Sequence, residues 1–257
     1  MAILPFLKTF AVFDWIIIAV CLAVALVFHY LPFSDSFQPT IHNDVNNTVL
    51  EDILPHYFTV MMIFIPGVLS VTGLALYVQK SITNAIYSVT AYLFSIVFTI
   101  LIVSITKFIV GRPRPDTYQL CGDFNSCKQQ LSKSQLADQF RSFPSSHAAE
   151  TMAAGAFISL FLCDVWESGT MSSSFFVLMP TFFSIFTSLL RITCHKTHID
   201  DVLIGFFIGG SVAYFSYHSY KRRIQDDQKS MTKIHDLSTS SESSIMSNPG
   251  QSLKRYC

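Results

Sequence analysis

The chain has 257 residues, of which 51% are hydrophobic and only 13% are charged. Soluble domains carry about 25% charged residues, so this composition excludes an ordinary soluble globular protein. Lysine plus arginine and aspartate plus glutamate number 17 each, and this balance gives no support to a nucleic-acid partner. The apolar residues gather in runs of about 20, the length needed to cross a bilayer core of about 30 Å. We therefore predict a multi-pass membrane protein.

Six runs are predicted to span the membrane, which makes the fold class an all-α bundle of six transmembrane helices. In chain order they cover residues 13–32, 57–78, 84–106, 147–164, 174–191 and 201–219. The first run is too long for the apolar part of a signal peptide and has no clear cleavage site, so it should remain as the first span.

The remaining segments complete the predicted domain organisation. Residues 1–12 form a short N-terminal segment, and residues 13–219 form the membrane domain. Residues 220–257 are rich in serine and have too few apolar residues to build a core, so we expect a disordered tail.

The basic residues and one polar loop indicate the orientation. With both termini in the cytosol, nine Lys and Arg residues lie on the cytosolic side and eight on the other, so the count alone does not decide. The triplet Lys221-Arg222-Arg223, directly after the last span, favours cytosolic termini. That orientation leaves the sequon at Asn46 and the pair Cys121 and Cys127 outside the cytosol, where glycosylation and disulfide formation are possible. We expect an endoplasmic reticulum, Golgi, vacuolar or plasma membrane.

Three polar clusters border the predicted spans. Residues 107–115 leave the third span, residues 141–150 enter the fourth, and residues 191–201 join the fifth to the sixth. Successive spans alternate in direction, so these borders face the same compartment. Segments scattered over 95 residues can therefore form one site.

The side chains of these clusters suit a phosphate ester. Arg114 and Arg191 carry planar guanidinium groups that bind phosphate oxygens in pairs, and Lys107 adds a point charge. Ser145 and Ser146 stand at the predicted start of a helix, where hydroxyl and backbone N–H groups can hold a further oxygen.

His147 follows in the first turn of that helix. Histidine changes protonation near neutral pH, so His147 can give a proton to a leaving oxygen. A histidine nucleophile backed by a carboxylate would complete a two-step displacement without metal. Charged residues near span ends are also common interfacial groups, and that simpler interpretation is kept for Lys196 and Asp200. Glu150 is expected to be a first-turn acid that the helix dipole favours, with a supporting role behind His147 left open.

The clusters, taken together, resemble the type 2 phosphatidic acid phosphatase family over about residues 13–219. The resemblance rests on three strings: Lys107-x6-Arg114-Pro115; Pro144-Ser145-Ser146-His147; and Arg191 followed by Asp201-Val202-Leu203-Ile204-Gly205. They look most like the lipid phosphate phosphatases. The strings Gly111-Arg-Pro-Arg-Pro-Asp116 and Phe140-Arg-Ser-Phe-Pro144 are similar to the fungal branch.

The resemblance implies an activity and a role for each matching residue. Lys107, Arg114 and Arg191 would bind the phosphate, His147 would protonate the leaving alcohol, and Asp201 would orient a nucleophilic histidine. The implied reaction is hydrolysis of lipid phosphates such as phosphatidate, lysophosphatidate or diacylglycerol pyrophosphate, with no metal or other cofactor.

The sequence departs from the family pattern most clearly at the nucleophile. The pattern Arg-x5-His-x3-Asp, counted from either Arg191 or Asp201, places Thr197 where the histidine belongs. His198 comes one residue late, and His195 two residues early. Two predictions follow: either His198 acts as the nucleophile, or the chain is a catalytically impaired relative that binds anionic lipid head groups. Ser146 in place of a glycine and Leu190 in place of a serine are smaller departures.

Overall fold

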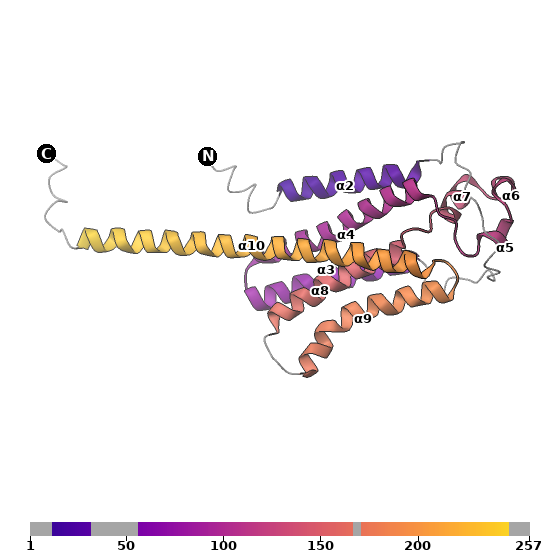
Figure 1. Ribbon diagram of the computed structural model, residues 1–257. Helices are drawn as coiled ribbons and strands as arrows, with labels where there is room; N and C mark the ends of the chain where they lie inside the picture. The colour runs from indigo at the N-terminus through magenta and orange to yellow at the C-terminus, as the bar shows by residue number, and fades with distance from the viewer. Residues whose placement is uncertain (1–11, 32–55, 167–170, 247–257) are drawn as a thin grey trace. The chain divides into compact units, whose positions relative to one another are not determined.

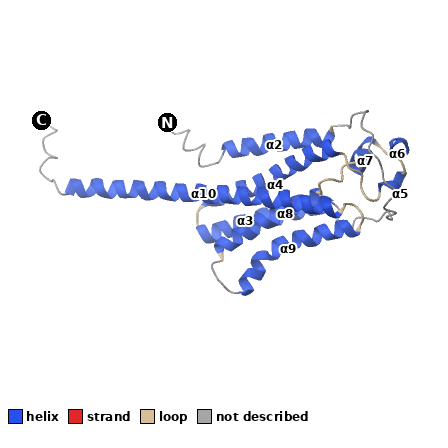
Figure 2. Ribbon diagram, in the orientation of Figure 1, coloured by secondary structure: helices blue, strands red, loops and turns tan. Residues whose placement is uncertain are grey.

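The computed structural model describes residues 12–31, 56–166 and 171–246. The chain divides into two compact units, Met1–Tyr217 and His218–Cys257, which are described separately. Regular structure within the described ranges is entirely helical, with no strand (Figure 2). The predicted N-terminal segment up to residue 11 and the sequon at Asn46 lie outside the described residues.

Six long helices are apolar enough to cross a membrane, which confirms the predicted fold class. They are α2 (Val12–Tyr30), α3 (His56–Gln79), α4 (Ile82–Val110), α8 (Ser146–Val165), α9 (Met171–Thr193) and α10 (Ile199–Met246). Three short helices, α5 (Thr117–Cys121), α6 (Phe124–Gln130) and α7 (Lys133–Gln139), lie between α4 and α8 (Figure 1). The protein is thus a multi-pass integral membrane protein.

Helix α10 is longer than the predicted sixth span. The span was expected to end at residue 219 and to be followed by a disordered tail, whereas the structure continues α10 as helix to Met246. No glycine or proline interrupts residues 211–248, and Lys, Arg and Gln, which favour helix, are frequent directly after the span. The domain boundaries at residues 12 and 219 stay predictions.

Helix α8 is the central helix of the first unit. It contacts α3, α4 and α9, and a larger share of its residues is buried than in any other long helix described. Its buried positions include Ala148, Ala149, Ala153 and Gly155. Small residues of this kind let membrane helices approach one another closely.

Two glycines of α10 show how closely that helix approaches α8. A Cβ atom added at Gly205 would lie 2.8 Å from the carbonyl oxygen of Ser145, and one added at Gly209 would meet the carbonyl oxygen of Ala149. Glycine is therefore required at both positions. This contact places the start of α10 directly against the start of α8.

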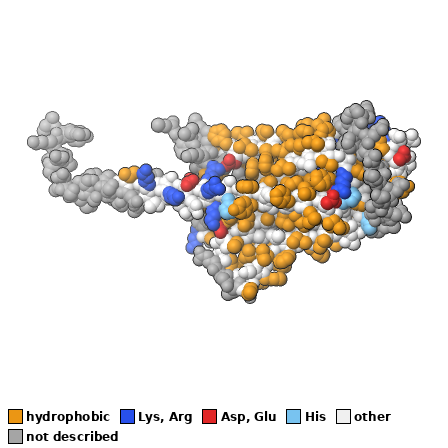
Figure 3. Space-filling view, in the orientation of Figure 1, with side chains coloured by type: hydrophobic (Ala, Val, Ile, Leu, Met, Phe, Trp, Pro, Cys, Tyr) orange, Lys and Arg blue, Asp and Glu red, His pale blue; other side chains and the backbone are white. Residues whose placement is uncertain are grey.

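The surface of the first unit matches a membrane location. Hydrophobic side chains cover the long helices, and charged and histidine side chains lie toward the ends of this hydrophobic band (Figure 3). Exposed large residues on α9 include Phe175, Phe176, Phe182, Phe183 and Phe186. In a bilayer such side chains contact lipid tails rather than water.

Candidate active site

The cluster at the end of α4 is bonded to the segment that precedes α8. Gly111 ends α4 in the left-handed region, with φ 59°, and the chain then turns along that segment. Lys107 donates from Nζ to the carbonyl of Arg141, and the N–H of Ser142 donates to the carbonyl of Arg112 over 3.0 Å. The first and second clusters are therefore in direct contact.

The cluster before α10 is bonded to both of the others. The N–H of Ser145 donates to the carbonyl of Asp201 over 3.0 Å, and the hydroxyl of Ser142 donates to the Asp201 carboxylate. Arg112 forms ion pairs with Asp200 and with Asp201, the latter over 2.7 Å to Oδ1. Three segments that are distant in sequence thus meet in one polar region.

Asp201 holds the histidine that directly precedes α10. Its Oδ2 lies 3.2 Å from Nδ1 of His198 and accepts the backbone N–H of the same residue over 3.1 Å. A carboxylate in the first turn of a helix commonly reaches back in this way to the residue at the helix start. Asp201 is fully buried, whereas the His198 side chain is 25% exposed. Nδ1 is engaged by the carboxylate, so Nε2 is the nitrogen left to react.

Thr197 occupies a different environment. It is buried, and its Oγ1 has no hydrogen-bond partner among the residues that the structure describes. A threonine hydroxyl is a poor nucleophile without an adjacent base. The turn that leads to His198 contains His195 with φ 56°, and it is closed by a 3.1 Å bond from the N–H of Lys196 to the carbonyl of Arg191. The structure therefore brings His198, and not Thr197, to the Asp201 carboxylate.

The start of α8 matches the predicted serine and histidine positions. Ser145 caps the helix, since its Oγ accepts the N–H of Ala148 over 3.4 Å, and Ser146 is the first helical residue. His147 follows and is 5% exposed. The N-terminus of α8 thus lies beside Asp201, whose carbonyl accepts the N–H of Ser145.

The three predicted phosphate ligands have different surroundings. Arg191 is buried in the last turn of α9, and Lys107 lies in the last turn of α4. Arg114 holds α7 through its side chain: Nε donates to the carbonyl of Asp138 over 2.9 Å and Nη2 to its Oδ1 over 2.6 Å. The Asp138 side chain is 67% exposed, whereas the Arg114 side chain is 12% exposed.

Sequence reasoning missed several residues of this region. Arg112, Ser142 and Asp138 stand in or beside the motifs, but nothing in their spacing indicates which partner each one meets. Lys196 and Asp200, interpreted as interfacial, form ion pairs: Lys196 with the buried Asp116 over 2.7 Å, and Asp200 with Arg112.

Arg141 has a structural role at the end of α2. Its guanidinium donates to the carbonyls of His29 and Leu31, which are acceptors that a helix C-terminus leaves without partners. Burial lowers the pKa of Arg141 from its ordinary value, and the carboxylate of Asp138 acts in the opposite direction. Arginine titrates far above neutral pH, so the charge is retained.

A disulfide lies beside this region. Cys121 and Cys127 are bonded, with their Cα atoms 4.8 Å apart, and both pack against the fully buried ring of Phe140. The disulfide joins α5 to α6, and Phe140 directly precedes Arg141. The possible pairing of these cysteines is thereby confirmed.

His198, Asp200 and Asp201 also form a group that could ligate a metal, since their ligand atoms lie within 4.8 Å of one another. Arg112 places one nitrogen, Nη1, against both carboxylates, so a side-chain cation already balances this acidic pair. The donor set fits an ion-pair network better than a metal site, because a metal would have to displace Arg112.

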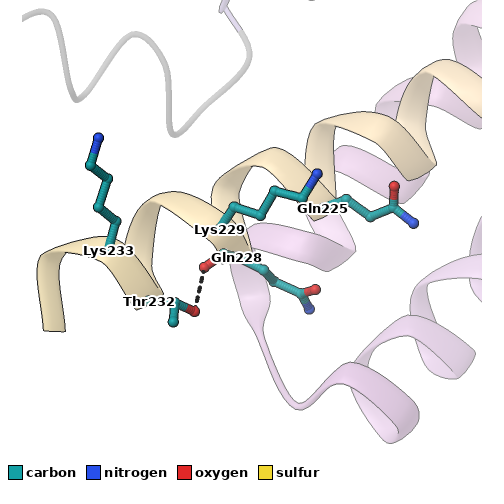
Figure 4. Close-up of a pocket in the computed structure, with 5 residues that line it drawn as sticks. All are labelled: Gln225, Gln228, Lys229, Thr232 and Lys233. Atoms are coloured by element: carbon teal, nitrogen blue, oxygen red, sulfur yellow. Dashed lines mark hydrogen bonds between the residues drawn. The ribbon is translucent and has the colours of Figure 1, made fainter. Parts of the chain in front are cut away.

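A hollow of about 690 Å³ lies in the second unit, along α10, and holds none of the motif residues. Figure 4 shows the five side chains that line it, with Thr232 bonded to the carbonyl of Gln228 over 3.1 Å. The lining residues are Gln225, Gln228, Lys229, Thr232 and Lys233. All five belong to one helix, α10.

Known proteins resemble the chain over most of its length. Lipid phosphate phosphatase 2 of Arabidopsis thaliana is 24% identical over 222 residues, which cover 81% of this chain and 76% of the relative. A probable diacylglycerol pyrophosphate phosphatase 1 of Schizosaccharomyces pombe is 29% identical over 225 residues, which cover 77% and 78%. No solved structure matches the chain.

A family model described as the PAP2 superfamily matches residues 88–225. The matched segment runs from within α4 to within α10 and contains all three motif clusters. It spans more than half of the chain, and the protein therefore belongs to the PAP2 superfamily.

Proposed function

We propose that the protein is a metal-independent lipid phosphate phosphatase that uses His198 as its nucleophile. The substrates would be phosphate monoesters such as phosphatidate and lysophosphatidate, together with diacylglycerol pyrophosphate. The names of the relatives support this class of substrate, because one is a lipid phosphate phosphatase and another a probable diacylglycerol pyrophosphate phosphatase.

The contact between His198 and Asp201 is the single observation that carries the proposal. A nucleophilic histidine needs a partner that fixes its ring and stabilises the charge it acquires. The 3.2 Å contact from Nδ1 to a fully buried carboxylate supplies that partner one residue later than the family spacing predicts. Thr197, at the expected position, has no such contact in the described part of the chain.

In the first step, Nε2 of His198 attacks the phosphorus and the bond from phosphorus to the ester oxygen breaks. His147 gives its proton to that oxygen, so the lipid leaves as an alcohol from a monoester and as phosphatidate from diacylglycerol pyrophosphate. Lys107, Arg114 and Arg191 balance the charge of the phosphate oxygens, and the N-terminus of α8 at Ser145 and Ser146 adds backbone donors.

In the second step, a water molecule attacks the phosphohistidine. His147, now neutral, accepts the proton of that water, the bond between Nε2 and phosphorus breaks, and inorganic phosphate leaves. Both histidines return to their starting protonation states. Neither step requires a metal, since the positive charge is supplied by side chains.

A location at the water–lipid boundary suits this substrate. The proposed groups stand at the end of α4, the start of α8, the end of α9 and the start of α10, so a lipid could keep its tails in the bilayer while its head group enters. We propose cytosolic termini and a luminal or extracellular site. The disulfide between Cys121 and Cys127 supports this orientation, because disulfides persist in oxidising compartments.

Phosphate release by the purified full-length chain tests the proposal. Phosphatidate in detergent micelles with excess EDTA should be hydrolysed, and His147→Ala and Arg114→Ala should each lower the rate strongly. Correctly folded protein that binds phosphatidate micelles without releasing phosphate would instead establish the head-group-binding relative. In that case, Thr197→His would test whether the family spacing restores turnover.

A further inference from the structure

Arg112 and Arg114 are two residues apart in the same motif but bond to different parts of the protein. Arg114 contacts Asp138 of α7, on the side where phosphate binding is proposed. Arg112 contacts the first turn of α10, through Asp200 and Asp201. Both are forks suited to phosphate, and the family resemblance assigns a role to Arg114 but none to Arg112.

Arg112 and the proposed nucleophile, His198, contact different oxygens of the Asp201 carboxylate. Nη1 of Arg112 is 2.7 Å from Oδ1 of Asp201, whereas Oδ2 takes Nδ1 and the backbone N–H of His198 and the hydroxyl of Ser142. Each carboxylate oxygen therefore has its own donors. Such a carboxylate cannot rotate without breaking bonds on both sides.

The negative charge of Asp201 also requires Arg112 as its partner. Asp201 is fully buried, and an unpaired carboxylate in a buried position is strongly disfavoured. The Arg112 side chain is 32% exposed, so it can carry its charge in contact with water while compensating Asp201. Among described residues, the ion pairs of the Asp201 carboxylate are with Arg112 and His198.

We propose that Arg112 is a positioning residue for the reaction: it holds the Asp201 carboxylate in the orientation that directs His198 at the phosphorus, and it does not bind the substrate phosphate. The inference rests on the proposed function, since it assigns a role within that same reaction. It distinguishes Arg112 from Arg114, which is proposed to contact the phosphate itself.

The two arginine variants should differ in which kinetic constant changes. A displacement of the nucleophile by about 1 Å costs about a hundredfold in rate, so Arg112→Ala should lower kcat by about a hundredfold and leave KM within about threefold. Arg114→Ala should raise KM by more than about tenfold, because a phosphate contact is lost. Phosphatidate in mixed micelles is the substrate for both.

Arg112→Lys provides the rescue that a purely structural role does not predict. A single nitrogen of Arg112 makes both carboxylate contacts, so one lysine ammonium can reproduce them. The lysine variant should recover at least about a tenth of the wild-type kcat, whereas Arg112→Gln, which keeps a donor without charge, should remain near the alanine variant. Arg114→Lys should recover less, since a paired fork is lost there.

Asp200→Asn is the matched control. Asp200 shares Nη1 of Arg112, but its side chain is 59% exposed, and the side-chain hydrogen bond of His198 is made with Asp201. Exposed ion pairs contribute little, so kcat should stay within about threefold of wild type. Elution as a single species in detergent confirms that each variant is folded. If Arg112→Ala does not meet this criterion, the kcat values of Arg112→Gln and Arg112→Lys are compared to test the positioning role.

The possible results separate the two proposals. An inactive wild-type chain overturns the proposed function, and the role of Arg112 with it. An active wild type with unchanged kcat in Arg112→Ala or Arg112→Gln, or with a rise in KM as the main effect, overturns the positioning role alone. A fall in kcat that lysine rescues supports it.

Discussion

The choice between His198 and Thr197 as nucleophile gives the sharpest test of the site. His198→Ala removes the ring nitrogen that would bond to phosphorus. Loss of a nucleophile costs on the order of 10⁴-fold or more in kcat, which corresponds to about 5.5 kcal/mol of activation free energy. The remaining activity should be close to background.

The matched variant Thr197→Val should have the opposite outcome. Thr197 is 7% exposed, and its Oγ1 has no partner among the described residues, so valine of similar shape breaks no described hydrogen bond. A buried polar group without a partner costs about 1–3 kcal/mol, so its removal should raise the free energy of unfolding by about 1 kcal/mol. Activity should be close to wild type.

Two measurements check this pair. Phosphate release from phosphatidate gives kcat and KM, and thermal unfolding in detergent gives relative stability. Phosphohistidine is destroyed by acid, so the reaction should be stopped under alkaline conditions. With phosphatidate labelled in its phosphate group, a labelled protein should then be found for wild type and Thr197→Val but not for His198→Ala. Activity that survives in His198→Ala and disappears in Thr197→Val would refute the reasoning.

Three further predictions concern the substrate ligand, the helix contact and the disulfide. Arg114→Ala should raise KM for phosphatidate more than it lowers kcat, and an unchanged KM would show that its guanidinium does not contact substrate. Gly205→Ala introduces a Cβ 2.8 Å from the carbonyl oxygen of Ser145, so it should destabilise the protein by about 1–3 kcal/mol. It should also reduce kcat, because it separates α10 from α8. A variant with the kcat and stability of wild type would contradict the assigned packing. The double change Cys121→Ser and Cys127→Ser opens a loop with a sequence separation of 6, so it should lower the free energy of unfolding by about 2 kcal/mol. The thermal midpoint in detergent measures this loss, and an identical midpoint would count against a stabilising disulfide.

The all-helical membrane fold is readable from the chain because its cause is local. Each span needs about 20 apolar residues, and hydrogen bonds within one helix satisfy its backbone in lipid. The six predicted spans therefore match six helices that are long and apolar enough to cross a membrane. The end of α10 was less readable, since helix propensity extends past the residues that lipid requires.

The residue types of the site were also indicated by the chain alone. Lys107, Arg114, His147 and Arg191 stand at span borders, and alternating spans bring those borders to one side. Charge and hydrogen-bonding capacity belong to the side chains themselves, so the match to phosphate chemistry did not depend on coordinates.

Only the tertiary structure decided which partners these side chains have. Counting residues placed Thr197 at the nucleophile position, whereas the turn at His195 and the start of α10 bring His198 to Asp201. The separation of Arg112 from Arg114 likewise depends on where α7 and α10 lie. The contact of His198 with Asp201 is local, three residues apart, and depends on where α10 begins. The contacts of Arg112 and Arg114 join loops and helix ends that are distant in sequence, where packing sets the distance between side chains.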